Sequence, residues 1–478
     1  MRAKIFAEEN KKWWTLGALA FALFMIMLDN TVVNVALPSI QRDLGIGLSE
    51  LEWTVNAYAL TFAVLMLSGG KLADFYGRRR VFLSGLIVFT ASSLACGLAT
   101  GGEMLIAART VQGIGAALML PATLSIISAT FPPHQRGTAI GIWAGVSAMA
   151  LAIGPLIGGL LTEHIDWSWI FFVNVPIGVI GFVVGRIVIR ESRDTSEEQR
   201  LDVPGLLASA IGLFALTFAL IEANSYGWSD PVIVGLFVAA AAALVVFVWL
   251  ELRQRTPMLD LSLFRSPTFA GANVVALLVT LAMFGVFFFM SLYMQNALGY
   301  SAVKTGAAFL PMTVLIILIA PAAGRFSDRI GSRWLMTAGM GLLAVSLVLF
   351  SRLDLASTFW DILPGLIVGG LGMATVMTPM TAAALGSVPV AKAGVGSGVL
   401  NTFRQVGGAM GIAVMGAIVA SYVDLDASAR PDPQAFIDGF HAALLVSAGF
   451  AVLGAVVAAT TVRQHRHLDA GELAEASA

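Results

Sequence analysis

Fourteen apolar stretches follow one another along this chain, each about as long as a membrane is thick. A spanning α-helix needs about 20 mostly apolar residues, and short polar or Gly/Pro-marked turns separate the stretches. With 58% hydrophobic and 12% charged residues, the chain has far more apolar surface than water could solvate. We therefore expect an all-α polytopic membrane protein with fourteen transmembrane helices. The stretches lie near 13–37, 50–70, 81–100, 104–129, 138–162, 169–190, 204–223, 232–252, 269–296, 303–323, 334–352, 361–385, 396–420 and 440–462.

The basic residues predict the orientation of these helices. With the N-terminus in the cytoplasm, 22 of the 28 Lys and Arg residues fall in inner segments and four in outer loops. Inner loops of membrane proteins carry this excess of positive charge. Because the number of spans is even, we expect both termini to be cytoplasmic.

Several function classes are disfavoured by what the sequence lacks. The single cysteine, Cys96, excludes an intramolecular disulfide and a cysteine-based metal cluster. The sequence has no GxxxxGKS or GxxxxGKT loop, which argues against an ATP-driven pump. It also has no HExxH motif, which argues against a metal-dependent hydrolase. The 28 basic and 29 acidic residues form no basic block with interleaved aromatics, so nucleic acid is not an expected partner. We expect no enzyme activity, no metal and no cofactor.

Two segments of the chain repeat each other. GKLADFYGRRR from Gly70 is matched by GRFSDRIGSR from Gly324, at an offset of 254. Four glycines recur at an offset of 257, namely Gly137, Gly141, Gly154 and Gly159, which pair with Gly394, Gly398, Gly411 and Gly416. Repeated halves with a site between them are typical of secondary transporters. We expect six-helix bundles at 1–200 and 268–478, in a pseudo-two-fold arrangement, with two inserted helices at 201–267.

Asp29 and Arg109 are charged residues within predicted spans. Asp29 lies roughly 24 Å along its helix from Trp13, beyond the midplane, where an ionised carboxylate is costly unless it is paired, hydrated or protonated. Arg109 lies at a similar depth, so the two side chains could pair. The duplicate of Arg109 is Leu366, which favours a function for the charge. Asp29 could instead anchor a neighbouring helix, and Arg109 could extend to the outer face.

Five motifs recur here that are typical of one protein family: the loop motif from Gly70, RTVQGIGAA from Arg109, the stretch from Gly145 that ends GPLIGG, LDNTVVNVALP from Leu28 and WIFFVNVPIG from Trp169. With these motifs the chain resembles the major facilitator superfamily, and within it the fourteen-span drug:proton antiporter branch. The resemblance implies that Arg109 takes part in proton coupling, and we hypothesise that its partner is Asp29.

The resemblance also implies gating residues. A carboxylate near a helix N-terminus, held by a neighbouring arginine, could form a latch between conformations. In span five, small residues and a proline allow close helix contact. The expected gating residues are Gly70, Asp74, Gly77, Arg78, Gly154, Pro155, Gly158, Gly159, Gly324, Asp328 and Gly331. Simple positive-inside anchoring is the alternative for the loop arginines.

The remaining candidates concern the cargo and a second proton site. We expect a mostly apolar cavity with a few polar groups, suited to lipophilic and often cationic compounds. Glu222, near the outer end of span seven, is either an interfacial carboxylate or a second proton or cation site. Arg404 is either an electrostatic element or a structural one. The expected cavity residues are Asn34, Trp53, Asn56, Tyr58, Gln112, Met119, Tyr293, Gln295, Met377, Asn401, Arg404 and Gln405.

These features together favour proton-driven export of small molecules by alternating access, with the proton as coupling ion. Lipid or metabolite export, uptake by symport and a non-transporting receptor on the same scaffold stay open. We expect a functional monomer in the lipid bilayer of a bacterial plasma membrane, exporting drugs or antibiotics.

Overall fold

The computed structural model describes residues 8–193, 202–254, 257, 259, 261–388, 393–423 and 433–463, and the regular structure in this part of the chain is entirely helical. Twelve of its helical segments are long and apolar enough to cross a membrane. The predicted all-α membrane class is therefore confirmed. Two more helices, α3 and α6, have 29 and 32 residues and complete the set of long helices.

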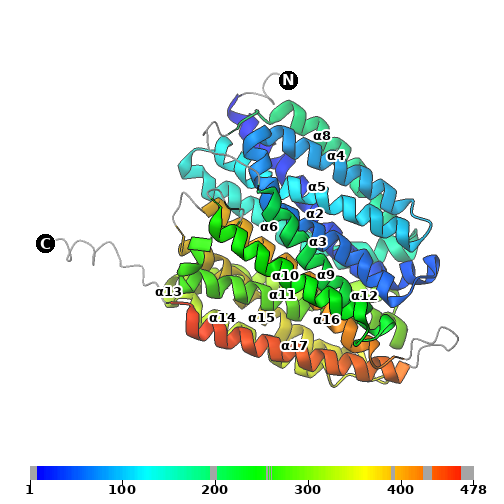
Figure 1. Ribbon diagram of the computed structural model, residues 1–478. Coiled ribbons are helices and arrows are strands. Elements are labelled where there is room, and N and C mark those ends of the chain that lie inside the picture. The colour runs from blue at the N-terminus through cyan, green and yellow to red at the C-terminus, as the bar shows by residue number, and fades with distance from the viewer. Residues whose placement is uncertain are drawn as a thin grey trace.

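The N-terminal set comprises helices α2 to α8. It contains α2 (Glu8–Leu44), α3 (Leu48–Tyr76), α4 (Arg78–Gly97), α5 (Gly102–Thr130), α6 (Pro133–His164), α7 (Trp169–Phe172) and α8 (Asn174–Val188). Within the set, α3 and α4 pack on α5, while α6 and α8 pack on α2. These blue and cyan helices lie together in Figure 1.

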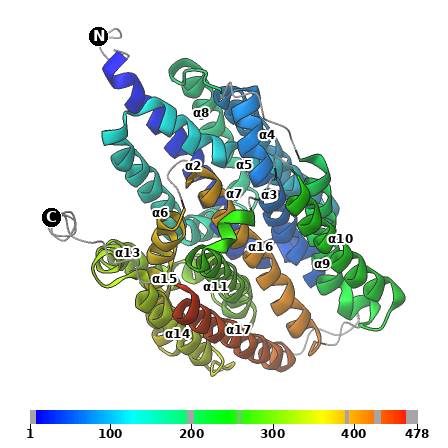
Figure 2. The same cartoon turned by 60° about the vertical axis from the view of Figure 1, so that its left-hand side comes forward.

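The C-terminal set comprises helices α11 to α17. It contains α11 (Pro267–Leu292), the π-helix η2 (Tyr293–Ala297), α12 (Ala302–Ala308), α13 (Leu310–Ile330), α14 (Ser332–Phe350), α15 (Phe359–Gly386), α16 (Ala393–Ala420) and α17 (Pro433–Thr461), preceded by the 3-10 helix η1 (Leu261–Arg265). The main contacts between the two sets join α16 to α3, α12 and α13 to α6, and α11 to α2. Figure 2 shows α16 lying between α11 and α3.

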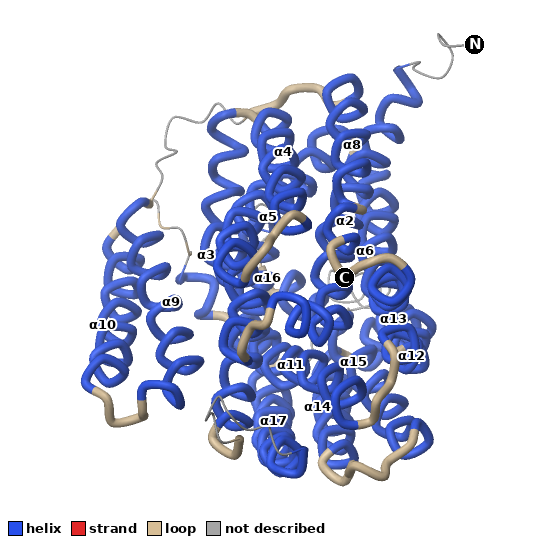
Figure 3. Tube along the Cα trace, turned by 90° about the vertical axis from the view of Figure 1, so that its right-hand side faces the viewer, coloured by secondary structure: helices blue, strands red, loops and turns tan. Residues whose placement is uncertain are grey.

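The linking pair, α9 (Val203–Tyr226) and α10 (Pro231–Arg253), stands to one side of both sets (Figure 3). Both helices begin with an aspartate cap and a proline in the first turn: Asp202 accepts a hydrogen bond from Gly205 N, and Asp230 accepts one from Val232 N. α9 packs on α3 and α16, whereas α10 packs mainly on α9. The linking pair therefore touches both sets through α9.

Single glycines separate the helices at the two repeated loops. Gly77 lies between α3 and α4 with φ +106°, and Gly331 lies between α13 and α14 with φ +85°. Residues with a side chain rarely adopt this backbone conformation. The glycine spacing in the two loops thus has the same structural basis.

Candidate functional site

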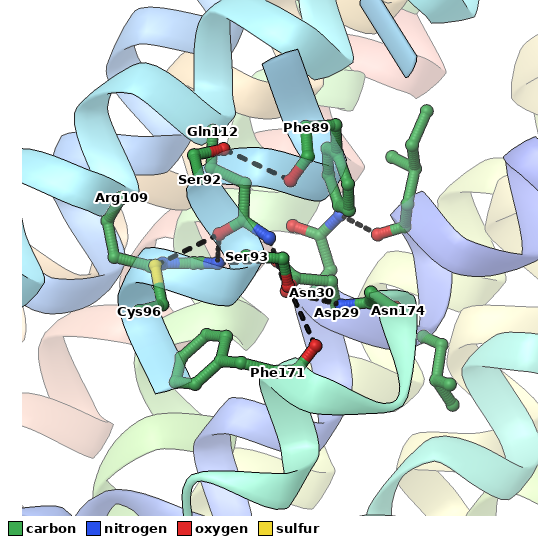
Figure 4. A network of polar contacts seen from close by, with 12 residues as sticks. Asp29, Asn30, Phe89, Ser92, Ser93, Cys96, Arg109, Gln112, Phe171 and Asn174 are labelled. Atoms are coloured by element: carbon green, nitrogen blue, oxygen red, sulfur yellow. Dashed lines mark hydrogen bonds and ion pairs between the residues drawn. The ribbon is translucent and has the colours of Figure 1, made fainter. Parts of the chain in front are cut away.

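A buried ion pair joins α2 to α5 in the N-terminal set. Arg109 Nη1 lies 2.5 Å from Asp29 Oδ2, and the exposed fractions of the two side chains are 1% and 0%. Figure 4 shows Asp29 and Arg109 with the polar groups around them. The similar depths expected from the sequence are reflected in this direct contact.

Two amide side chains bind the other oxygen of the Asp29 carboxylate. Gln112 Nε2 donates to Asp29 Oδ1 at 3.0 Å, and Asn174 Nδ2 approaches the same atom at 3.5 Å. Asn174 also donates to Ser93 Oγ at 3.0 Å, and Ser93 donates to the Phe171 carbonyl at 2.9 Å (Figure 4). Helices α4, α5, α7 and α8 therefore fix the carboxylate in place.

Arg109 has partners besides Asp29. Its Nη1 donates to Gln112 Oε1 at 2.7 Å, and its Nε donates to the Thr54 carbonyl of α3 at 3.1 Å. The guanidinium carbon lies 4.2 Å from the centroid of the Tyr58 ring. A cation over an aromatic face is stabilised by the ring quadrupole. The arginine can thus keep hydrogen bonds and a ring contact if the aspartate loses its charge.

This arrangement can accept a proton on Asp29 without a rearrangement of the other contacts of Arg109. Transfer of a proton to Asp29 would turn a neutral ion pair into a lone cation, whose other contacts are already in place. The change in net charge acts in a region without access to water, where electrostatic energies are large. Hydrogen bonds through Gln112 and Asn174 would transmit that change to α5 and α8.

The expected gating residues lie in two regions. Arg78 donates its backbone N–H to Ser192 O at 2.8 Å and its Nη1 to Ser125 O at 3.5 Å. Gly70 and Gly324 face Pro121 and the Thr378 methyl group, respectively. The side chains of Asp74 and Asp328 lie outside the part of the chain that the structure describes.

The span-five motif packs on two neighbours. Gly154 and Gly158 face α2, where a Cβ would meet Thr31 and Val32. Gly159 faces α12 of the C-terminal set, and Gly306 of α12 lies against the carbonyl of Pro155. The motif therefore contributes to packing within the N-terminal set and to contact with the C-terminal set.

The expected cavity residues are dispersed in the structure. Gln112 and Tyr58 belong to the ion-pair network, whereas Met119 is fully buried in the core beside Gly85. Tyr293 OH donates to the Asp354 carbonyl at 2.5 Å, and Gln295 Nε2 donates to the Val35 carbonyl at 2.8 Å. The other members are buried or half-buried along their helices: Asn34, Trp53, Asn56, Met377, Asn401, Arg404 and Gln405.

Two cavities lie at the predicted outer end. One, of about 320 Å³, is lined by the ends of α2 and α6 and by the loop before α12, and Gln295 is the expected cavity residue on its wall. The other, of about 20 Å³, lies between α3, α9 and α16. Glu222 is near this second cavity and accepts a hydrogen bond from Ser49 Oγ at 2.5 Å. It is separate from the Asp29 network.

Sequence reasoning missed four contributors to these sites. Asn174, Ser93 and the Thr54 carbonyl hold the ion pair, and Glu52 is buried beside the small cavity. Asn174 had a usable signal, since it is an amide within the apolar WIFFVNVPIG motif. A main-chain carbonyl such as that of Thr54 has no sequence signal.

The sequence profile of the Major Facilitator Superfamily matches residues 19–412 and 274–477. The tetracenomycin C resistance and export protein of Streptomyces glaucescens is 37% identical over 414 residues, covering 87% of this chain and 77% of that protein. The puromycin resistance protein of Streptomyces alboniger is 37% identical over 460 residues, covering 94% and 91%. The methylenomycin A resistance protein of Streptomyces coelicolor is 38% identical over 414 residues and covers 86% of each chain.

Solved structures share the fold at low sequence identity. A bacterial homolog of the human lysosomal transporter Spinster, in an inward-facing and unoccupied conformation, aligns with a TM-score of 0.65 at 17% identity and covers 95% of this chain and 98% of that chain. The peptide transporter POT aligns with a TM-score of 0.66 at 15% identity and covers 93% of each chain.

Proposed function

This chain belongs to the major facilitator superfamily of membrane transporters, and we propose that it exports lipophilic, often cationic small molecules in exchange for protons. Its similarity to drug resistance and export proteins extends along most of the chain. It acts as a transporter and not as an enzyme. The observation that carries proton exchange is the buried Asp29–Arg109 pair, because one proton neutralises Asp29 and changes the net charge of the pair from zero to +1.

We further propose fourteen spans in two six-helix bundles, as in the drug:proton antiporter branch. α3 packs along the candidate spans α5 and α16, and α6 packs along the candidate span α2, which supports a membrane crossing for both. The linking pair then forms spans seven and eight. With the excess of basic residues inside, both termini lie in the cytoplasm of a bacterial cell. One chain encloses its own path, so the functional unit is a monomer.

Alternating access is supported by where the two sets touch. The hydrogen bonds described between them lie at the predicted outer end, including Gln295 to the Val35 carbonyl and Val303 N to Glu163 Oε2. Rocking of the sets about a central site would break such contacts and expose that site to the outside. Asp29 would then take a proton from outside as the cargo leaves there, and the return of the sets would let it release the proton inside.

The proton gradient supplies the free energy for export. Each elementary charge that crosses the membrane contributes about 2.3 kcal/mol per 100 mV. While Asp29 is ionised, Arg109 balances its charge, and protonation leaves Arg109 with the Thr54 carbonyl and the Tyr58 ring. A change in this balance alters which conformation is favoured, and that link couples the proton to the cargo.

The decisive experiment compares Asp29→Asn with Glu103→Gln, an exposed carboxyl at the predicted outer end. In everted vesicles with an imposed pH gradient, we expect uphill dye movement in the wild type and in Glu103→Gln. Asp29→Asn should lose uphill movement but keep exchange of dye down its own gradient. Uphill movement at the wild-type rate in Asp29→Asn would refute the role of Asp29.

The same vesicles test the other possible functions. Cargo movement in the direction of the proton would indicate symport. An absence of gradient-dependent movement for every compound tested would favour a receptor or another cargo, such as a lipid. Because the relatives are resistance proteins for tetracenomycin C, puromycin and methylenomycin A, the first panel should contain these compounds and lipophilic cations.

A further inference from the structure

Glu52 of α3 is a buried acid outside the Asp29 network. Its exposed fraction is 2%, and its Oε2 atom has no hydrogen-bond partner among the described residues. A buried carboxylate without a cation or a hydrogen-bond donor is costly, and binding a proton removes that cost. The side chain therefore needs an explanation beyond packing.

Three helices from different parts of the chain meet at Glu52: its own helix α3, with α9 and α16. Its carboxylate lies against Gly416 of α16, where a Cβ would collide with it. Glu222 of α9 is bound to Ser49, one turn from Glu52 on α3. Asn224 Nδ2 of α9 donates to the Ala417 carbonyl of α16 at 2.6 Å. The N-terminal set, the C-terminal set and the linking pair thus meet at this acid.

The small cavity at this junction is lined by Glu52 and has room for one water molecule. Its volume is about 20 Å³, and its wall includes Ser49 and Asn224. One turn deeper, Asn56 of α3 and Thr217 of α9 are fully buried, with side-chain polar atoms that lack partners among the described residues. The two helices are at matching levels there, since the Trp53 and Phe218 rings are 6.0 Å apart.

Among the residues that the structure describes, no neighbouring cation balances the two acids. Glu222 is the one charged residue of α9, and the one charged residue of α16, Arg404, lies twelve residues from Gly416, roughly 18 Å along the helix. On α5, Glu103 is exposed and Arg109 binds Asp29. The other charged groups on helices packed against Glu52 either have their own partners or lie at the inner ends of α2 and α3: Lys11, Lys12, Arg42, Asp43, Glu50, Lys71, Asp74, Arg78, Arg79 and Arg80.

We propose that Glu52 and Glu222 form a second proton-binding site, at which one shared proton holds α9 against α3 and α16. The proton comes from water: a hydronium ion transfers it to one carboxylate, and the acid so formed donates to the other carboxylate, directly or through one water. Loss of the proton leaves two like charges at the junction, which repel each other and loosen it. The site is distinct from Asp29 and does not require that Asp29 carries protons.

Infrared titration of the purified protein tests this site. Protonated carboxyl groups have a C=O stretching band that ionised ones lack. At neutral pH we expect this band in the wild type, its loss in Glu52→Gln and its retention in Asp29→Asn and Glu103→Gln. In Glu222→Gln the band should persist but disappear at a pH lower by about one unit or more, because the coupled acid is gone. Failure of the Asp29 proposal would leave these results unchanged.

A distance measurement separates a proton site from a structural contact. Spin labels on exposed positions at the outer ends of α9 and α17 should move apart as pH rises in the wild type, and this response should be lost in the Glu52→Gln, Glu222→Gln double variant. If the two acids had only a structural role, the double variant would differ from the wild type in this distance at every pH, and the distance would still respond to pH. An unchanged infrared band in Glu52→Gln, or a pH response that survives in the double variant, would overturn the proposal.

Discussion

The N-terminal and C-terminal sets differ most in where they bury charge. Among the described residues, the buried charged side chains are Asp29, Glu52, Arg109, Asp202 and Glu251, and none of them lies on α11 to α17. At the repeat offsets, Met283 corresponds to Asp29 and Leu366 to Arg109. Buried charge is costly in a membrane, and its restriction to one set and the linking pair indicates a function that the duplicated scaffold alone does not need.

The two duplicated contacts between the sets show the same difference. α6 meets α12 through backbone, with Gly159 against Ala302 and Gly306 against Pro155. The equivalent contact joins α16 to α3, where Gly416 corresponds to Gly159 and Glu52 corresponds to Gly306. One contact is therefore backbone packing, and the other has a carboxylate in place of a glycine. The comparison suggests that only the α3–α16 contact responds to protons.

The largest effect should follow from making the N-terminal set resemble the C-terminal one at Arg109. Arg109→Leu copies the residue at 366 and leaves the buried Asp29 without its cation. Breaking a buried pair in this way costs about 3–5 kcal/mol. Thermal unfolding in detergent should show a marked loss of stability, whereas Leu366→Met, which nearly conserves volume, should cost less than about 1.5 kcal/mol.

The double variant Asp29→Asn, Arg109→Leu separates stability from coupling. With both charges removed, we expect most of the lost stability to return, while uphill transport stays absent. If the Arg109→Leu variant has the thermal stability of the wild type, the pair carries no buried charge. The two sets would then not differ in where they bury charge.

A smaller effect is expected at the backbone contact. Gly306→Val places a side chain against the Pro155 carbonyl, which cannot move without shifting α6. Overpacking of this kind costs about 1–3 kcal/mol. The equilibrium between the conformation with a closed outer end and the one with an open outer end should therefore shift toward the open one by about 5- to 150-fold. Labelling of a cysteine placed at Thr162 in the outer cavity, in a background without Cys96, would measure this. Gly101→Ala is the control, because a Cβ at this position has open space around it. Gly299→Ala, in the loop beside the same cavity, is unsuitable because the φ of Gly299 is +65°.

The α3–α16 contact should tolerate a small addition better. Gly416→Ala meets the end of the Glu52 side chain and not the backbone, so the carboxylate can turn aside. We expect Gly416→Ala to lower the stability of this contact by about 1 kcal/mol or less. The distance between the spin labels on α9 and α17 should also respond differently to pH. If Gly416→Ala and Gly306→Val have equal effects at every pH, the two contacts are alike and the comparison is wrong.

The sequence predicted the helices better than the faces they turn to each other. Span lengths follow from apolar runs, so the stretch expected at 104–129 lies within the helix Gly102–Thr130. The depths of Asp29 and Arg109 follow from helix rise, and the two residues meet. Glu52, at the start of its span, has the pattern of an interfacial residue, and only the packing of α9 and α16 buries it. Met119 could not be distinguished from a cavity residue because apolar side chains serve both purposes.

The smallest effect should come from Glu163, which is an acid at the backbone contact. Its carboxylate is exposed and accepts a hydrogen bond from Val303 N at 2.7 Å. Exposed charge contacts contribute less than about 1 kcal/mol, so Glu163→Gln should change the labelling rate at the outer cavity by no more than about two-fold. If this variant instead opens the outer end as far as Gly306→Val does, then a carboxylate and not the backbone holds α6 on α12. Both contacts between the sets would in that case depend on an acid, and the distinction between a fixed contact and a proton-sensitive one would not stand.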